Sequence, residues 1–236
     1  MLKRINLGML IILALMLILN YSEGRFSNPR EWLLNLVIML PGIIIGLSFH
    51  EFAHGYVSHL LGDPTPKAQG RLTLNPLAHV DPIGFVALMF CGFGWGIPVE
   101  INPVYYKHRR RDEFLVSLAG VLMNLILAVI ASFVIKLLLS TSLYSTAMGD
   151  ILIQIFVQVA IINLVLMVFN LIPVPPLDGF GIVTQIFNLR KYDWYYKVYN
   201  NGMWILLALI LFNVTDLILS PAVNGIWRIL CNLIIY

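Results

Sequence analysis

The sequence has little charge: Asp, Glu, Lys and Arg together make up 11% of its 236 residues. Soluble globular domains carry about 25%. Hydrophobic residues reach 59%, so this composition excludes an ordinary soluble enzyme and predicts an integral membrane protein. The net charge is only +3, and the chain has no dense basic stripe with interleaved aromatic residues. Nucleic acid is therefore not an expected partner.

Cysteine is also scarce. The two cysteines, Cys91 and Cys231, lack the short spacing of metal ligands, so we expect two free thiols. No Gly-x-Ser-x-Gly string occurs, which argues against a serine nucleophile. No polar stretch is long enough for an appended soluble domain, and we expect one domain over residues 1–236.

Long apolar stretches dominate the chain, and a transmembrane helix needs about 20 such residues. They lie at 5–21, 32–61, 83–98, 114–139, 150–173 and 201–220, with a short one at 222–236. The pattern predicts an all-α membrane protein, a polytopic bundle of about five to six transmembrane helices. Stretch 83–98 is short, holds four glycines and ends in Pro98. It is typical of a re-entrant or hairpin element that lines a cavity.

Basic residues predict the orientation in the cell membrane. Lys3 and Arg4 precede the first stretch, and no small-x-small cleavage site follows it. We therefore expect a retained first span with a cytosolic N-terminus. The basic run 107–111 precedes a span on the same side, whereas the loop 140–150 has no Lys or Arg. This topology places residues 50–54 and 173–179 near the cytosolic ends of two inward-running helices, where they can meet.

The string His50-Glu51-Phe52-Ala53-His54 interrupts the longest apolar run. In a helix, His50 and His54 lie one turn apart on one face, so that two imidazoles can bind one metal ion. Glu51 lies beside them and can take a proton from a water molecule. Ionisable groups at membrane depth are costly and usually functional. The string is typical of a zinc hydrolase site within a membrane.

Asp178 is the best remaining candidate for a third ligand, because catalytic zinc usually has three protein ligands. Three prolines, Pro173, Pro175 and Pro176, end the preceding helix and favour an extended segment. Gly179 allows an unusual backbone angle next to the carboxylate. A plain turn or a helix cap is the alternative for this aspartate. His79 and Asp81, in the loop before stretch 83–98, are candidates either for a pair that supports a metal ligand or for a direct contact with the metal, and a solvated loop is the alternative.

Two strings together resemble the site-2 protease family of intramembrane zinc metalloproteases, peptidase family M50. They are His50-Glu51-x-x-His54 and Asn170-x-x-Pro173-x-Pro175-x-Leu177-Asp178-Gly179. Residues 62–76 look like the minimal bacterial branch, which lacks PDZ and CBS domains. Ser117–Asn124 resembles the family's Ala-Gly-Pro-x-x-Asn string, with Val121 in place of the proline. The resemblance implies a catalytic core of about 32–190, with accessory spans at 5–21 and 201–220.

The resemblance implies one zinc ion per chain, bound by His50, His54 and Asp178, with Glu51 as the general base. It implies that Asn170 and Asn124 orient the substrate or stabilise the oxyanion, although a hydrogen bond between helices is the alternative for each. The implied substrates are transmembrane proteins or signal-peptide remnants, cut within or near the bilayer on its cytosolic side. A metal-ion transporter or an inactive scaffold would also keep buried His and Asp. However, the chain shows no repeated halves, which are usual in transporters.

Overall fold

In the computed structural model, residues 7–92 and 94–236 are described, and they form helices joined by short loops. The helices longer than one 3₁₀ turn are α1 (Leu7–Ser22), α2 (Pro29–Leu60), α3 (Thr65–Ala68), α4 (Pro82–Cys91), α5 (Arg109–Leu139), α6 (Ala147–Asn170), α7 (Asp178–Phe187), α8 (Asp193–Leu211) and α9 (Asp216–Leu230), which continues as a π-turn over Cys231–Ile235. Within these ranges, β structure is limited to one antiparallel bridge between Val80 and Gly96. The prediction of an all-α protein is confirmed.

Among the described residues, four helices are long and apolar enough to cross a bilayer: α2, α5, α6 and the stretch Asp216–Ile235. The apolar helices α1 and α4 are shorter, and residues 5 and 6 of the predicted first span lie outside the described residues. Both cysteines are free thiols. The chain is therefore a multi-pass membrane protein, as its composition predicts.

Two predicted stretches differ in detail from the observed helices. Stretch 201–220 is divided, because α8 ends at Leu211, Asn213 adopts a left-handed φ of 55° and α9 begins at Asp216. Asn and Asp compete with the helical backbone for hydrogen bonds, which favours a break there. In stretch 83–98, α4 has only 10 residues and ends at Cys91, and the next residue, Gly92, has a φ of +76°. Phe93 lies outside the described residues, and the chain then returns past Val80.

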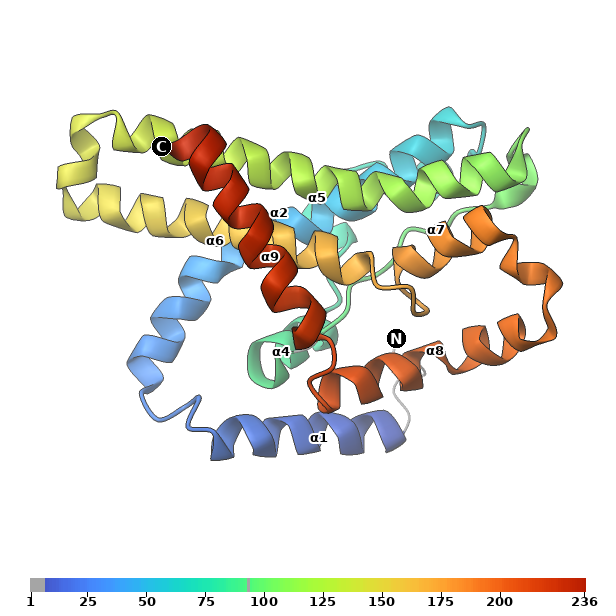
Figure 1. Cartoon of the computed structure of the whole chain (residues 1–236), viewed down its shortest axis with the longest axis horizontal. Coiled ribbons are helices and arrows are strands. Elements are labelled where there is room, and N and C mark those ends of the chain that lie inside the picture. Colours follow the sequence, from blue (N-terminus) through green and yellow to red (C-terminus); the bar gives the residue numbers. More distant parts are fainter. Residues whose placement is uncertain (1–6, 93) are drawn as a thin grey trace.

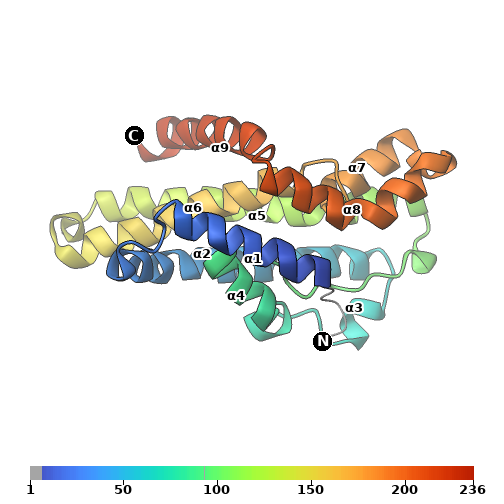
Figure 2. The ribbon, with the colours of Figure 1, turned by 90° about the horizontal axis from the view of Figure 1, so that it is seen from below.

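Helices α2, α5 and α6 pack against one another (Figure 1). Figure 2 shows α9 on one side of the α5–α6 pair and α2 on the other. Gly42 and Gly46 let α2 approach α6 closely: a methyl group at position 46 would lie 2.6 Å from Cδ1 of Leu166 and 3.1 Å from Oδ1 of Asn163. Small residues one turn apart are typical of close helix contacts in membranes.

Apolar side chains fill the contacts between the helices. One cluster joins α5, α6 and α9 through Val121, Ala128, Leu164, Met167, Val168, Val223 and Leu230. A smaller cluster of Met16, Cys91 and Leu207 joins α1, α4 and α8. The polar residues described below therefore lie inside an apolar bundle, where each of them needs a partner.

Candidate metal centre

Three predicted ligands converge between α2 and the start of α7. The Nε2 atoms of His50 and His54 are 3.0 Å apart. Oδ2 of Asp178 lies 3.2 Å from the first and 3.3 Å from the second. A tetrahedral ion with bonds of about 2.0–2.1 Å separates its ligands by about 3.3 Å. The three atoms therefore fit around one zinc-sized ion, with a position left open for a fourth ligand.

The second nitrogen of each imidazole is engaged by α5. Nδ1 of His54 lies 2.7 Å from the carbonyl oxygen of Val116, and Nδ1 of His50 lies 2.6 Å from Oδ1 of Asn124. Because an oxygen without hydrogen can only accept, both Nδ1 atoms carry a proton, and in the neutral form of each ring Nε2 then presents a lone pair. Two lone pairs and a carboxylate oxygen repel one another at these distances. A cation between them removes this repulsion, so the chemistry of the donor set fits a metal ion.

Gly120 brings α5 against the two imidazoles. A methyl group at this position would lie 2.5 Å from Nε2 of His54 and 2.6 Å from Cε1 of His50. These distances are far below ordinary contact. Only glycine therefore allows α5 to come close enough to hold both rings.

The carboxylate of Glu51 is held by the backbone of the loop after α4. Its Oε2 atom accepts a hydrogen bond of 2.8 Å from the Val99 N–H. The loop is fixed on either side of this contact, because the Ile97 N–H donates to the His79 carbonyl at 2.7 Å and the Asn102 N–H donates to Asp63 at 2.7 Å. Sequence reasoning did not predict this support for Glu51, because a backbone donor leaves no signature in residue types.

The two predicted amide side chains have different surroundings. Asn124 is fully buried, and its Nδ2 donates to the carbonyl oxygen of Gly46 and to Oδ1 of Asn163. All its polar atoms are thus engaged within the bundle, which favours the alternative of a hydrogen bond between helices. Asn170 is partly exposed at the end of α6 and donates to the Leu166 carbonyl of its own helix. Its predicted contact with substrate stays a prediction.

His79 lies in the loop before α4. It is fully buried, and its Nε2 lies 2.8 Å from the carbonyl oxygen of Thr73. Among the described residues, the group that could hold a metal consists of His50, His54 and Asp178 without His79. The predicted part of His79 in the metal centre stays a prediction. Neighbouring Asp81 caps α4 by accepting from the N–H groups of Ile83 and Gly84.

Asp178 is placed by the proline-rich turn before it and by contacts at the far end of α7. Gly179 does not need a positive φ, contrary to the sequence prediction. A side chain there would instead collide with the backbone carbonyl groups of Leu171 and Ile172. The requirement for glycine is thus one of space, because the turn folds tightly back on the end of α6.

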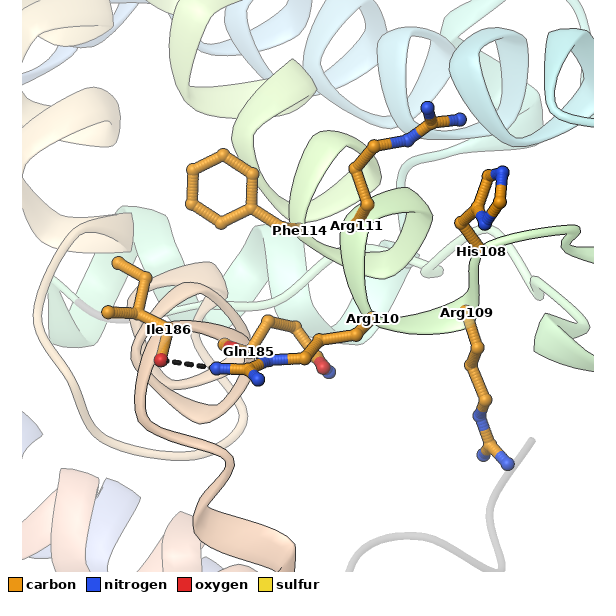
Figure 3. A pocket seen from close by; sticks show the side chains of 7 residues that line it. All are labelled: His108, Arg109, Arg110, Arg111, Phe114, Gln185 and Ile186. Carbon is orange, nitrogen blue, oxygen red and sulfur yellow. Dashed lines mark hydrogen bonds between the residues drawn. The ribbon is translucent and has the colours of Figure 1, made fainter.

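The C-terminal end of α7 is fastened to the start of α5. The Arg110 guanidinium donates to the carbonyl oxygens of Gln185 and Ile186, the second at 2.5 Å (Figure 3). Cations are favourable at this end of a helix. Buried Glu113 adds a second fastening, because it accepts from Gln185 and pairs with Arg190 at 2.5 Å. Both contacts fix the helix that carries Asp178.

Asp63 fastens the loop after α4 to the end of α2. Fully buried, it accepts from the Asn102 N–H at 2.7 Å, the Thr65 N–H at 2.9 Å and the Ser58 hydroxyl at 2.8 Å. Burial alone would raise the pKa of this carboxyl, but the three donors outweigh it and hold the pKa below its ordinary value. Burial likewise raises the pKa of Tyr106, whose hydroxyl also contacts Ser58, to about 12.

An Asp63→Asn variant should melt lower than the wild type at pH 7, by roughly 4–8 °C. The pH dependence of this stabilisation follows from the depressed pKa of Asp63 in the folded state. The carboxylate stabilises the fold at pH values above its unfolded-state pKa of about 3.9. It loses this effect as the pH falls through its folded-state pKa. The difference should therefore shrink below about pH 4. Thermal unfolding in detergent from pH 3 to pH 7 measures it, with exposed Asp193→Asn as the control. If the difference in melting temperature between Asp63→Asn and the wild type did not change with pH, the ionised carboxylate of Asp63 would not be the source of the stabilisation.

Comparison with known proteins agrees with this geometry. A family model, Peptidase family M50, matches residues 38–213, more than half of the chain. The chain is 42% identical to "Putative zinc metalloprotease YwhC" of Bacillus subtilis over 163 residues, 67% of this chain and 71% of that protein. It is 31% identical to "Putative zinc metalloprotease Rip2" of Mycobacterium tuberculosis over 183 residues, 75% of this chain and 68% of that protein. No solved structure matches the chain. The histidine pair, the aspartate and the matched region together identify this chain as a member of peptidase family M50.

Proposed function

We propose that this protein is an intramembrane zinc metalloprotease, with zinc held by His50, His54 and Asp178 and with Glu51 as the general base. The observation that carries the proposal is the convergence of the two histidine Nε2 atoms and one carboxylate oxygen within 3.3 Å of one another. Two of these residues lie on a helix long and apolar enough to span the bilayer. Such a donor set is unfavourable there without a cation. The names of the M50 relatives add support for zinc as that cation.

When bound at this site, zinc supplies a Lewis acid that polarises the scissile carbonyl and favours ionisation of water. Glu51 takes the proton of the attacking water and returns it to the leaving amine. The Val99 N–H fixes one oxygen of the Glu51 carboxylate, which leaves the other oxygen to accept the proton. Asn124 and the Val116 carbonyl keep both imidazoles in the tautomer that binds metal. Asn170, at the end of α6, is the proposed contact for the substrate strand.

The loop 97–102 is the proposed guide for the substrate. Peptide bonds in a transmembrane helix are hidden by their own hydrogen bonds, so the substrate must present an extended segment. Ile97 and Val99 direct their N–H groups toward the protein. In an extended strand, neighbouring residues direct theirs to the opposite side. Because Pro98 has no N–H, the Glu100 N–H is the proposed donor to an added strand on that side. Single-pass membrane proteins and signal-peptide remnants offer such segments near the bilayer surface.

The basic residues support a cytosolic position of the site. Arg109, Arg110 and Arg111 begin α5, and Arg190 and Lys191 follow α7. Lys and Arg are enriched on the cytosolic side of membrane proteins. The ligands on α2 and α7 lie toward the same ends of the bundle, so the proposed orientation has a cytosolic N-terminus and cleavage on the cytosolic side.

Metal removal tests the proposal. The purified wild-type protein in detergent should contain one zinc per chain and cleave members of a panel of single-pass membrane substrates. Extraction of the zinc with a chelator should abolish cleavage, and one equivalent of added zinc should restore it, because the ion supplies the Lewis acid. Metal analysis and gel-based cleavage assays measure both quantities. The His54→Ala variant serves as the control that should recover neither zinc nor cleavage.

Two outcomes would favour the alternatives. Zinc binding without cleavage of any substrate, together with zinc flux into vesicles that contain the protein, would indicate a transporter. Zinc binding with neither cleavage nor flux would indicate a scaffold that keeps the fold of the family. Absence of metal from the wild type would contradict the proposed centre itself.

A further inference from the structure

Asn163 is a polar residue in the middle of apolar helix α6, and sequence reasoning did not connect it with the site. Its side chain is fully buried. The Nδ2 atom donates to the Val159 carbonyl oxygen at 2.8 Å, and the Oδ1 atom accepts from Nδ2 of Asn124 at 2.9 Å. Because a carbonyl oxygen can only accept, the bond to Val159 fixes which end of the Asn163 amide faces Asn124. That end is the acceptor.

The orientation of Asn124 follows from its two acceptors. Its Nδ2 donates to Oδ1 of Asn163 at 2.9 Å and to the Gly46 carbonyl oxygen at 3.2 Å. Its Oδ1 therefore faces Nδ1 of His50, at 2.6 Å. This contact requires the proton of the neutral His50 ring on Nδ1, which leaves the lone pair of Nε2 directed at Asp178. The backbone carbonyls of α6 and α2 thus set the tautomer of a ligand through two amides.

We propose that Asn163 is a positioning residue of the metal centre, which acts through Asn124 to hold His50 in its Nδ1–H tautomer. The proposal rests on the proposed function only in taking His50 as a zinc ligand. Without Asn163, the 3.2 Å contact with Gly46 is the remaining restraint on the Asn124 amide. A flipped amide would present its N–H group to Nδ1 of His50. The ring would then carry its proton on Nε2, where the metal binds.

The test compares two substitutions of Asn163 in the full-length protein. Asn163→Leu keeps the approximate size and removes the acceptor, and it should weaken zinc affinity about 10-fold, as the loss of an outer-shell partner typically does. Asn163→Asp keeps an acceptor for Asn124 in either protonation state. In its neutral form, which burial favours, it can also donate to Val159. Its zinc affinity should stay within about threefold of the wild type. Competition with a chromogenic chelator measures both affinities.

A matched control removes a buried hydrogen bond elsewhere. Ser132 is fully buried on α5, and its hydroxyl donates to the carbonyl oxygen of Ala128 one turn earlier, much as Asn163 donates to Val159. Ser132→Ala should leave zinc affinity unchanged. A double-mutant cycle with Asn124→Leu isolates the pathway. If Asn163 acts through Asn124, the double variant should bind zinc no more weakly than Asn124→Leu alone.

Imidazole ¹⁵N resonances of the metal-free protein give a readout that packing alone would not move. The His50 signal, assigned by its loss in His50→Gln, should show a protonated Nδ1 in the wild type and a mixture of tautomers in Asn163→Leu. Wild-type affinity and an unchanged tautomer in Asn163→Leu would overturn the inference, as would a 10-fold loss in a folded Asn163→Asp. Failure of the wild type to bind zinc would instead refute the proposed function. The tautomer measurement would still test whether Asn163 acts on His50 through Asn124.

Discussion

A Gly120→Ala variant should fold and fail to hold its metal. The added methyl group would lie 2.5 Å from Nε2 of His54 and 2.6 Å from Cε1 of His50. The rings cannot easily move away, because Asn124 and the Val116 carbonyl hold their other nitrogens. We expect zinc affinity to fall by about 100-fold or more, since both ligands are displaced at once. Zinc content after gel filtration and a chelator competition assay measure the change.

Gly225→Ala is the matched control. This glycine lies in α9, and a methyl group there would meet no atom within 4 Å. Alanine is the better helix former by about 1 kcal/mol, so this variant should bind zinc normally and melt at the same or a slightly higher temperature. Wild-type zinc affinity in Gly120→Ala would contradict the close approach of α5 to the histidines.

Glu51→Gln should keep its zinc and lose cleavage by about 10²- to 10⁴-fold, the usual contribution of a general base. Glutamine has the same shape, and its oxygen can still accept from the Val99 N–H. It cannot take a proton from water. The three ligand atoms on His50, His54 and Asp178 do not involve Glu51, so metal content should not change. The rate of cleavage at saturating substrate and the zinc content of the same sample form the measurement.

Glu31→Gln provides the comparison within the same helix, because Glu31 is exposed in the first turn of α2. It should cleave at the wild-type rate. Unchanged cleavage in Glu51→Gln would move the general base to another residue. Loss of zinc from this variant would mean that Glu51 belongs to the ligand set.

The local part of the site could be predicted from the sequence because helix geometry fixes it. His50 and His54 share a face in any helix, and the proline-rich string marks where α6 must end and Asp178 can turn inward. The apolar runs likewise predict α2, α5 and α6 closely. These features depend on spacing and residue type within one segment.

The remaining features depend on distances between segments, which the order of residues does not contain. The sequence shows Asn163 only as a polar residue in an apolar helix. Its connection with the site appears once its contact with Asn124 on α5 is known. The need for glycine at position 120 comes from two rings on another helix. The break between α8 and α9 is not predicted, because stretch 201–220 has the length of one span. Asn213 and Asp216, which lie at the break, are just two of the polar residues in that stretch.

The ligand atoms belong to helices that lie on either side of α5 and α6 in the chain, α2 before them and α7 after them. An ion held by both helices cross-links distant parts of the polypeptide, so the free energy of binding adds to the free energy of unfolding. At a free ion concentration 100 times the Kd, this contribution is about 2.7 kcal/mol. A melting temperature for this protein therefore has a definite meaning only at a stated free zinc concentration.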